Sequence, residues 1–214
     1  LKAEESKEIL NRELILCRRT SRLPYKPQKI DERICKLLSV EAKNFGHEFV
    51  FSTDSNLIEK ILILNKNTLF YDMEDAPTRK EVDSWVRYSA KQAKNKKDGL
   101  WTYCLRIPGV FTYLFFKLRF VFDLTIIKKI MGTFYLQTTK GTKTVGWLQG
   151  PMKSPNDWLA SGRMLMRLWL LMAQVNIYIH PFGFIITNPK DYKEYLELIK
   201  TQQSGTRPLW PGLS

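Results

Sequence analysis

The sequence contains few of the residues that build metal or disulfide sites. Its three cysteines, Cys17, Cys35 and Cys104, lie far apart and form no Cys-x-x-Cys pair. This argues against a disulfide framework and against a zinc site. The only histidines are His47 and His180, which removes most other metal constellations. We therefore predict no metal centre, and a reducing cytoplasm as the location.

Familiar catalytic motifs are also missing. The chain has no Gly-x-Gly-x-x-Gly, and Gly141-Thr142-Lys143-Thr144 matches only the end of a phosphate-binding loop because the upstream glycine is absent. It has neither a Gly-x-Ser-x-Gly elbow nor a His-Glu-x-x-His pair. A chain with few candidate catalytic side chains is consistent with a protein whose cofactor carries out the reaction.

Acidic residues are outnumbered by basic ones. The 34 lysines and arginines against 21 aspartates and glutamates give a formal net charge of +13. Such an excess predicts an anionic partner, which can be a nucleotide phosphate, a nucleic acid or a membrane surface. Lysines such as those between Lys91 and Lys97 are scattered, as is typical of a solvated face, so charge alone does not establish nucleic-acid binding.

The polar start of the sequence, Leu1 to Ser6, does not resemble a secretory leader.

The chain length and the hydrophobic pattern predict an α+β fold. A length of 214 residues suits one domain, residues 1–214, and the lack of an initial Met suggests that it belongs to a longer polypeptide. Helices are predicted at about 3–17, 32–45, 55–65, 77–93, 158–176 and 191–201, with Asp31 and Asp157 as N-caps. Strands are predicted at 48–52, 133–139, 145–148 and 181–187. Helices and strands mix without strict alternation.

A segment rich in aromatic and aliphatic residues runs from Trp101 to Met131. Arg106, Lys117, Arg119 and Asp123 interrupt it, so it does not resemble a membrane-spanning helix. A core or subunit-interface segment is the favoured interpretation, and docking of 101–131 on a membrane surface is the alternative.

The pentad Arg18-Arg19-Thr20-Ser21-Arg22 follows an apolar helical turn and precedes Pro24. Guanidinium forks and neighbouring hydroxyls suit a phosphate group. The alternative is an ordinary basic helix end, because cations near a helix C-terminus are favoured.

The order of these motifs resembles the nitroreductase family of FMN proteins. The resemblance implies that Arg18, Thr20 and Arg22, with Arg19 between them, hold the flavin phosphate. The helix from Ser161 to Asn176, followed by Ile179 to Phe184, is similar to that family's central helix and ring-binding turn. The resemblance therefore implies Pro181, Phe182 and Gly183 as contacts of the flavin ring, and Arg207 as a basic residue that returns to the phosphate.

One segment departs from the family pattern. Glu41 to Phe49 lacks the proline and tryptophan of the usual flavin-contacting stretch, which leaves Asn44, with His47 nearby, as the candidate there. The chain is more similar to a divergent branch, the Acg-type flavin proteins, whose motifs are echoed by Trp85-Val86-Arg87 and Asp98-Gly99-Leu100.

The resemblance implies a nitroreductase-like fold, with a central, mostly antiparallel sheet flanked by helices in an intertwined homodimer. The implied activity is transfer of electrons from NAD(P)H through FMN to a small-molecule acceptor such as a nitroaromatic or a quinone. The flavin N5 carries that chemistry, so no catalytic side chain is assigned. Two alternatives stay open: a flavin-holding or regulatory module without turnover, and a basic protein that binds a membrane surface or, less in keeping with the scattered lysines, nucleic acid.

Overall fold

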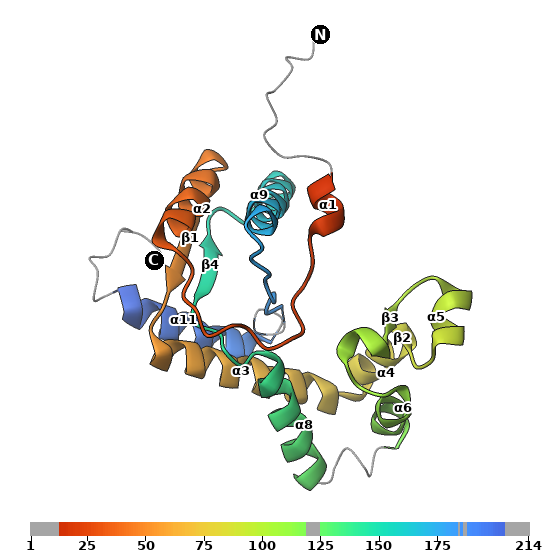
Figure 1. The fold of residues 1–214 in the computed structure, drawn as a ribbon. Coiled ribbons are helices and arrows are strands. Elements are labelled where there is room, and N and C mark those ends of the chain that lie inside the picture. The colour runs from red at the N-terminus through yellow and green to blue at the C-terminus, as the bar shows by residue number, and fades with distance from the viewer. Residues whose placement is uncertain (1–12, 119–124, 184, 186–187, 204–214) are drawn as a thin grey trace. The chain divides into compact units, whose positions relative to one another are not determined.

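The computed structural model describes residues 13–118, 125–183, 185 and 188–203 (Figure 1). These residues are mostly helical and include a small two-stranded antiparallel sheet, which is compatible with the predicted α+β class. The chain divides into two compact units. Unit 1 comprises the residues up to Ser21, Lys26–Asp54 and Thr142–Pro181, and unit 2 comprises Arg22–Tyr25, Ser55–Gly141 and the residues from Phe182 onward.

Unit 1 is built around the pairing of two distant strands. β1 (Glu48–Ser52) and β4 (Val145–Gln149) are antiparallel, with Glu48 opposite Gln149 and Ser52 opposite Val145. The helices of this unit are α1 (Glu13–Cys17), α2 (Glu32–Asn44) and α9 (Pro155–Gln174). Figure 1 shows α2 beside this strand pair. The predicted strands at 48–52 and 145–148 are confirmed.

The caps of α2 and α9 explain where these helices begin. Asp31 accepts the backbone N–H of Arg33 at 2.7 Å, so the predicted cap of α2 is confirmed. The predicted cap of α9 is wrong: Ser154 is the N-cap, and Asp157 lies three residues inside the helix. The two residues form a capping box, in which the Asp157 carboxylate accepts the Ser154 N–H at 2.8 Å.

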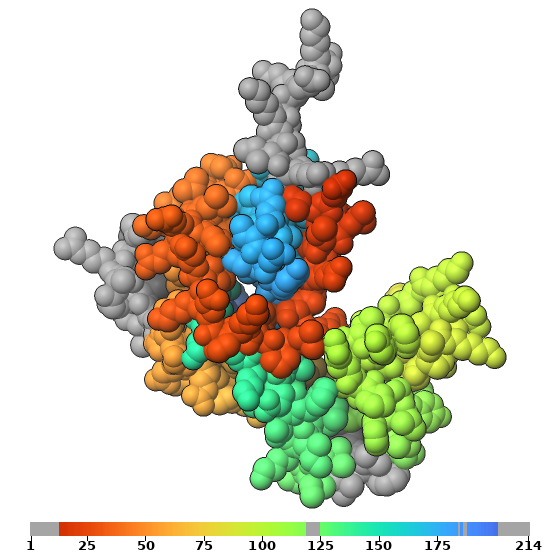
Figure 2. All heavy atoms as spheres, in the orientation of Figure 1, coloured from red at the N-terminus to blue at the C-terminus, as the bar shows by residue number. Residues whose placement is uncertain are grey.

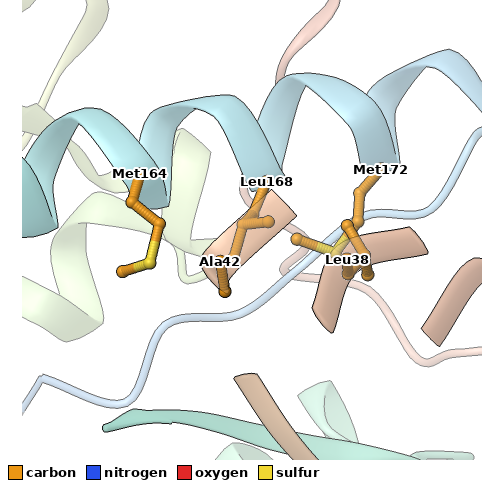
Figure 3. Packing of buried hydrophobic residues seen from close by; sticks show 5 residues of the cluster. All are labelled: Leu38, Ala42, Met164, Leu168 and Met172. Atoms are coloured by element: carbon orange, nitrogen blue, oxygen red, sulfur yellow. The ribbon is translucent and has the colours of Figure 1, made fainter. Parts of the chain in front are cut away.

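The core of unit 1 lies between α2 and α9. Figure 3 shows the five buried side chains that form it, Leu38, Ala42, Met164, Leu168 and Met172. Their spacing of four residues along each helix places them on one helical face. In the space-filling view, part of α9 lies between α2 and α1 (Figure 2).

Unit 2 contains the remaining elements. They are α3 (Ser55–Glu74), α4 (Ala76–Trp85), β2 (Val86–Arg87), α5 (Ala90–Lys96), β3 (Leu100–Trp101), the 3-10 helix η1 (Thr102–Leu105), α6 (Gly109–Lys117), α8 (Thr125–Thr138) and α11 (Pro189–Gln203). β2 and β3 form a short parallel pair. α3 extends nine residues beyond the predicted end at Asn65, and the predicted helix at 191–201 lies within α11.

The predicted helix at 77–93 is interrupted: residues 77–85 lie in α4 and residues 90–93 in α5, and the chain between them is not helical. α4 ends at Trp85, and the backbone is extended at Val86 and Arg87. The Arg87 side chain is largely buried and donates to Asp98 Oδ1 at 2.9 Å and to the Ser84 carbonyl at 2.7 Å. These contacts stabilise the end of helix α4 and the extended residues after it, which the helical spacing of the sequence does not reveal.

Two of the predicted strands are not found among the described residues. Residues 133–138 belong to α8, because Gly132 is buried there against Lys66 and Phe70 of α3. The described residues at the start of the predicted strand 181–187, Pro181 to Gly183, lie in no strand. Of the predicted helix at 3–17, residues 3–12 lie outside the described part of the chain.

Candidate functional site

The predicted phosphate-binding pentad begins directly after α1. The Arg18 N–H donates to the Leu14 carbonyl at 2.9 Å and so closes the last turn of that helix. Thr20 then forms an isolated parallel bridge with Ile179, and the Ser21 N–H donates to the Ile179 carbonyl at 2.8 Å. Thr20 and Ser21 are therefore neighbours of Ile179 inside unit 1.

Helix α9 holds the start of the pentad through Trp169. The Arg18 guanidinium carbon lies 4.1 Å from the centre of the Trp169 ring, and the indole N–H donates to the Arg19 carbonyl at 3.4 Å. A cation over an indole face is stabilised by about 0.5–2 kcal/mol, depending on its exposure to water. The Trp169 side chain is half-buried and supports Arg18. No spacing rule could have found a contact between residues so far apart in the chain.

Arg18 retains an unused hydrogen-bond donor. Its Nε is buried and has no hydrogen-bond partner among the described residues. A buried donor without an acceptor costs about 1–3 kcal/mol, so such atoms are rare in folded proteins. An oxygen of a phosphate or carboxylate is the acceptor that a guanidinium prefers. The arrangement therefore fits a site for an anionic group, and Arg19 and Thr20 beside it are exposed.

No family model, curated protein or solved structure matches this chain.

The remaining predicted site residues are distributed as follows. Pro181 is exposed at the end of unit 1. Arg22 and Phe182 are half-buried and Gly183 is exposed, and these three belong to unit 2. A Cβ added at Gly183 would meet no atom within 4 Å, so the backbone there is open to approach. Arg207 lies outside the described residues.

Asn44 is exposed at the last position of α2. Its amide donates to Glu41 Oε2 at 3.3 Å, and the other carboxylate oxygen of Glu41 pairs with Arg167 of α9. Within the described residues, the Asn44 side chain bonds to Glu41 and not to the pentad. The side chain supports the link between α2 and α9 in this structure.

His47 serves to hold unit 1 together. It is 3% exposed, with Nδ1 2.8 Å from the Phe45 carbonyl and Nε2 2.7 Å from Ser161 Oγ. A carbonyl only accepts, so Nδ1 carries a proton, and in the neutral ring Nε2 accepts from the Ser161 hydroxyl. Gly150 packs on the imidazole so closely that an added Cβ would lie 2.2 Å from Cδ2. Both ring nitrogens are thus occupied by groups of the fold itself.

The pKa values of Tyr88 and Asp83 in unit 2 are shifted by burial and by a local ion-pair network. Burial, together with the hydrogen bond to Asp83, raises the pKa of Tyr88 far above its usual range. Burial would also raise the pKa of Asp83, but hydrogen bonds from Lys117 and Tyr88 outweigh it and lower the value.

In the part of the chain that the structure describes, no group of three His, Cys, Asp or Glu side chains could hold a metal, and no helix is long and apolar enough to cross a bilayer.

Proposed function

We propose that this chain binds FMN through the Arg18 to Arg22 pentad and uses NAD(P)H to reduce a small acceptor, such as a nitroaromatic or a quinone. The observation that carries the proposal is the pairing of Thr20 and Ser21 with Ile179. It sets the anion-binding residues beside the segment that leads into Pro181, where the resemblance to nitroreductases expects the flavin ring. This pairing supports a single cofactor site built from both ends of the sequence.

The phosphate end of the cofactor would be held by Arg18, with Arg19, Thr20 and Arg22 as further donors. Each charge-assisted hydrogen bond to the phosphate contributes about 1.5–3 kcal/mol. Trp169 keeps the Arg18 fork in place before the ligand arrives, which lowers the entropy lost on binding. Arg207 and Asn44 stay predictions, and Asn44 would have to release Glu41 to take part.

The ring end would lie against Pro181, Phe182 and Gly183. When bound, the flavin supplies the hydride chemistry at its N5. The chain has only to bind and orient the ring, and the open backbone at Gly183 leaves space for a flat ligand to approach. No side chain is required as a general base, in keeping with the scarcity of histidine.

A homodimer is part of the proposal. α9 carries four exposed apolar side chains around the exposed Gly162, namely Trp158, Leu159, Leu165 and Met166. A Cβ at Gly162 would meet nothing within 4 Å, so a second helix could approach closely. Exposed apolar clusters of this kind are typical of protein interfaces. Sedimentation velocity on the wild type and on Leu165→Glu tests this part, with a shift from dimer to monomer as the expected result.

The test of flavin binding is a titration of the purified protein with FMN. We expect a yellow complex whose affinity falls about tenfold or more in Arg18→Ala and less in Arg18→Lys, which keeps the charge but loses the fork. Arg163→Ala, at an exposed arginine of α9 in the same unit, is the matched control and should bind as the wild type does. A protein that cannot be reconstituted with FMN, or equal affinity in Arg18→Ala, contradicts the proposal.

Turnover is tested separately from binding. Anaerobic addition of NADH or NADPH should bleach the visible flavin absorbance, and a quinone should restore it. Retained flavin that neither nicotinamide bleaches would instead identify a flavin-holding module of the same fold.

A further inference from the structure

The outer side of α8 is apolar and exposed. Ile126, Ile130 and Phe134 are 65%, 57% and 38% exposed, and their spacing of four residues puts them on one side of the helix. The opposite side faces α3: Gly132 is buried against it, Tyr135 pairs with Asn65, and Lys128 reaches Glu74 at 2.6 Å. We call Ile126, Ile130 and Phe134 the α8 stripe. It is the side of α8 that unit 2 leaves uncovered.

A second exposed apolar group of unit 2 lies at η1 and α6. Tyr103, Val110 and Phe111 are 72%, 62% and 63% exposed. Val110 and Phe111 are apolar, and Tyr103 has an aromatic ring with a polar end. Such side chains are typical of a bilayer interface. Water-soluble surfaces seldom expose several large apolar side chains in one unit without a partner.

Basic residues outnumber acidic ones in the sequence around these groups, although Lys117 of α6 is paired with Asp83 and Lys128 of α8 with Glu74. Neither α6 nor α8 contains an aspartate or a glutamate. From Ala90 to Lys140 the sequence has ten lysines and arginines and only two acidic residues, and one of these, Asp98, is paired with Arg87. Lys129 is exposed in α8, one residue before Ile130. A positive field next to exposed apolar side chains is complementary to an anionic lipid surface.

We propose that unit 2 docks on the surface of an anionic bilayer, with the α8 stripe inserted among the lipid headgroups and Lys129 among the phosphates. Aliphatic insertion distinguishes this from nucleic-acid binding, which would use the lysines but gain nothing from Ile126 and Ile130. The excess of basic residues, with no acidic residue within α6 or α8, favours an anionic surface over an ordinary protein interface. Docking does not depend on the proposed flavin site. Apart from Arg22, Phe182 and Gly183, the described residues of that site belong to unit 1.

The experiment is co-sedimentation of the full chain with lipid vesicles. We expect binding to phosphatidylcholine vesicles that contain about a third phosphatidylserine, weak binding to pure phosphatidylcholine, and loss of binding at high salt. Replacing the α8 stripe in Ile126→Ser, Ile130→Ser and Phe134→Ser together should lower the partition coefficient about tenfold or more. The matched control is Leu37→Ser with Val40→Ser on α2 of unit 1, where both apolar side chains are exposed as well.

The charge contribution has its own matched pair. Lys129 and Lys36 are exposed and each is the fifth residue of its helix, α8 and α2 respectively. Lys129→Glu should weaken binding several-fold and Lys36→Glu should not. Equal binding by the stripe variant and the wild type overturns the proposal. So does a wild type that fails to bind anionic vesicles, one that binds duplex DNA with the same sensitivity to the stripe, or a stripe variant that turns a dimer into a monomer.

A fluorescent label removes the dependence on how well the stripe variant folds. With Cys17 and Cys104, both exposed, changed to Ser, an environment-sensitive dye is attached at Ile130→Cys or, as control, at Val40→Cys. Anionic vesicles should shift the emission of the dye at position 130 to the blue and leave that at position 40 unchanged. An equal response at both positions, or none, contradicts insertion of the α8 stripe.

Discussion

Arg18 and His47 both lie against α9, and their hydrogen bonds separate a candidate ligand contact from a structural residue. The Arg18 side chain rests on Trp169 but leaves Nε without a partner among the described residues. The His47 ring bonds to Phe45 on one side and to Ser161 on the other. A ligand can improve the hydrogen bonding of the first residue and would only disturb that of the second.

We predict that His47→Ala lowers the free energy of unfolding by about 2–4 kcal/mol, because it opens a cavity and leaves the Phe45 carbonyl without its donor. Ser161→Ala should cost about 1–2 kcal/mol, since it leaves a buried ring nitrogen without a partner. Urea denaturation followed by circular dichroism measures both. Asn44→Ala, at an exposed position three residues away, is the control and should change stability by less than about 0.5 kcal/mol. A loss below about 1 kcal/mol in His47→Ala would mean that the imidazole is not part of the structural core.

At the scale of the element, α9 depends on its first turn. Ser154 caps the helix and Asp157 completes the capping box. The pKa of Asp157 is lowered mainly by the backbone N–H of Ser154, with further contributions from the Ser154 side chain and the Lys153 N–H. A carboxylate whose folded-state pKa is lowered stabilises the fold above its ordinary pKa, and that stabilisation is lost as pH falls through the lowered value.

We therefore predict that Asp157→Asn destabilises the protein at neutral pH and that its difference from the wild type shrinks below about pH 3.8, the ordinary aspartate value. Urea midpoints measured from pH 7 down to pH 3 test this. Ser154→Ala serves as comparison, because it removes the cap itself and should cost about 1 kcal/mol at neutral pH. A constant gap between Asp157→Asn and the wild type over the whole range would show that the charge does not act through the helix start.

The packing of α8 on α3 is the second element that single substitutions can test. Gly132 is buried at this contact, where an added Cβ would lie 3.4 Å from Lys66 and 3.8 Å from Phe70. Alanine fits at these distances and favours the helix, so Gly132→Ala should stabilise the protein by about 0.5–1 kcal/mol. Gly132→Leu should destabilise it by about 1–3 kcal/mol through overpacking.

The control for Gly132 is the exposed Lys36 of α2. Thermal unfolding should show Lys36→Leu tolerated where Gly132→Leu is not. A helix that accepts leucine equally at both positions would contradict the close approach of α8 to α3.

The elements that could be predicted from the sequence are those whose signals are local. Asp31 marks the start of α2, and aromatic and β-branched residues mark β1 and β4. The elements that were mispredicted are set by distant contacts. Thr133 to Thr138 has strand-forming residues, yet this segment is helical and packs on α3. The Thr133 hydroxyl donates to the Lys129 carbonyl at 2.9 Å within the helix. Likewise, the support that Trp169 gives to Arg18 exists only once α9 and the end of α1 have come together.

At the scale of the whole molecule, unit 1 is discontinuous in sequence and yet has its own core and sheet. Leu38, Ala42, Met164, Leu168 and Met172 all belong to it, as do both strands of its sheet. The intervening residues 55–141 belong to unit 2. The pairing of the two strands therefore closes a long loop, whose entropy cost the contacts of unit 1 must offset.

The strand register suggests how that loop can be removed. Ser52, the last residue of β1, is paired with Val145, the first residue of β4. Paired residues in an antiparallel ladder are about 4.5–5.5 Å apart, so a short glycine-containing turn can join the two strands as a hairpin. We predict that a chain in which such a turn replaces residues 55–141 still folds, because it keeps the core, the strand pair and the contact of Arg18 with Trp169. Circular dichroism should show one cooperative thermal transition. Leu168→Ala, which removes a side chain that is 1% exposed, should abolish this transition or strongly lower its midpoint temperature. A non-cooperative melt of the parent chain would mean that unit 1 needs residues 55–141 to fold, and the proposed flavin site would then have to be studied only in the intact protein.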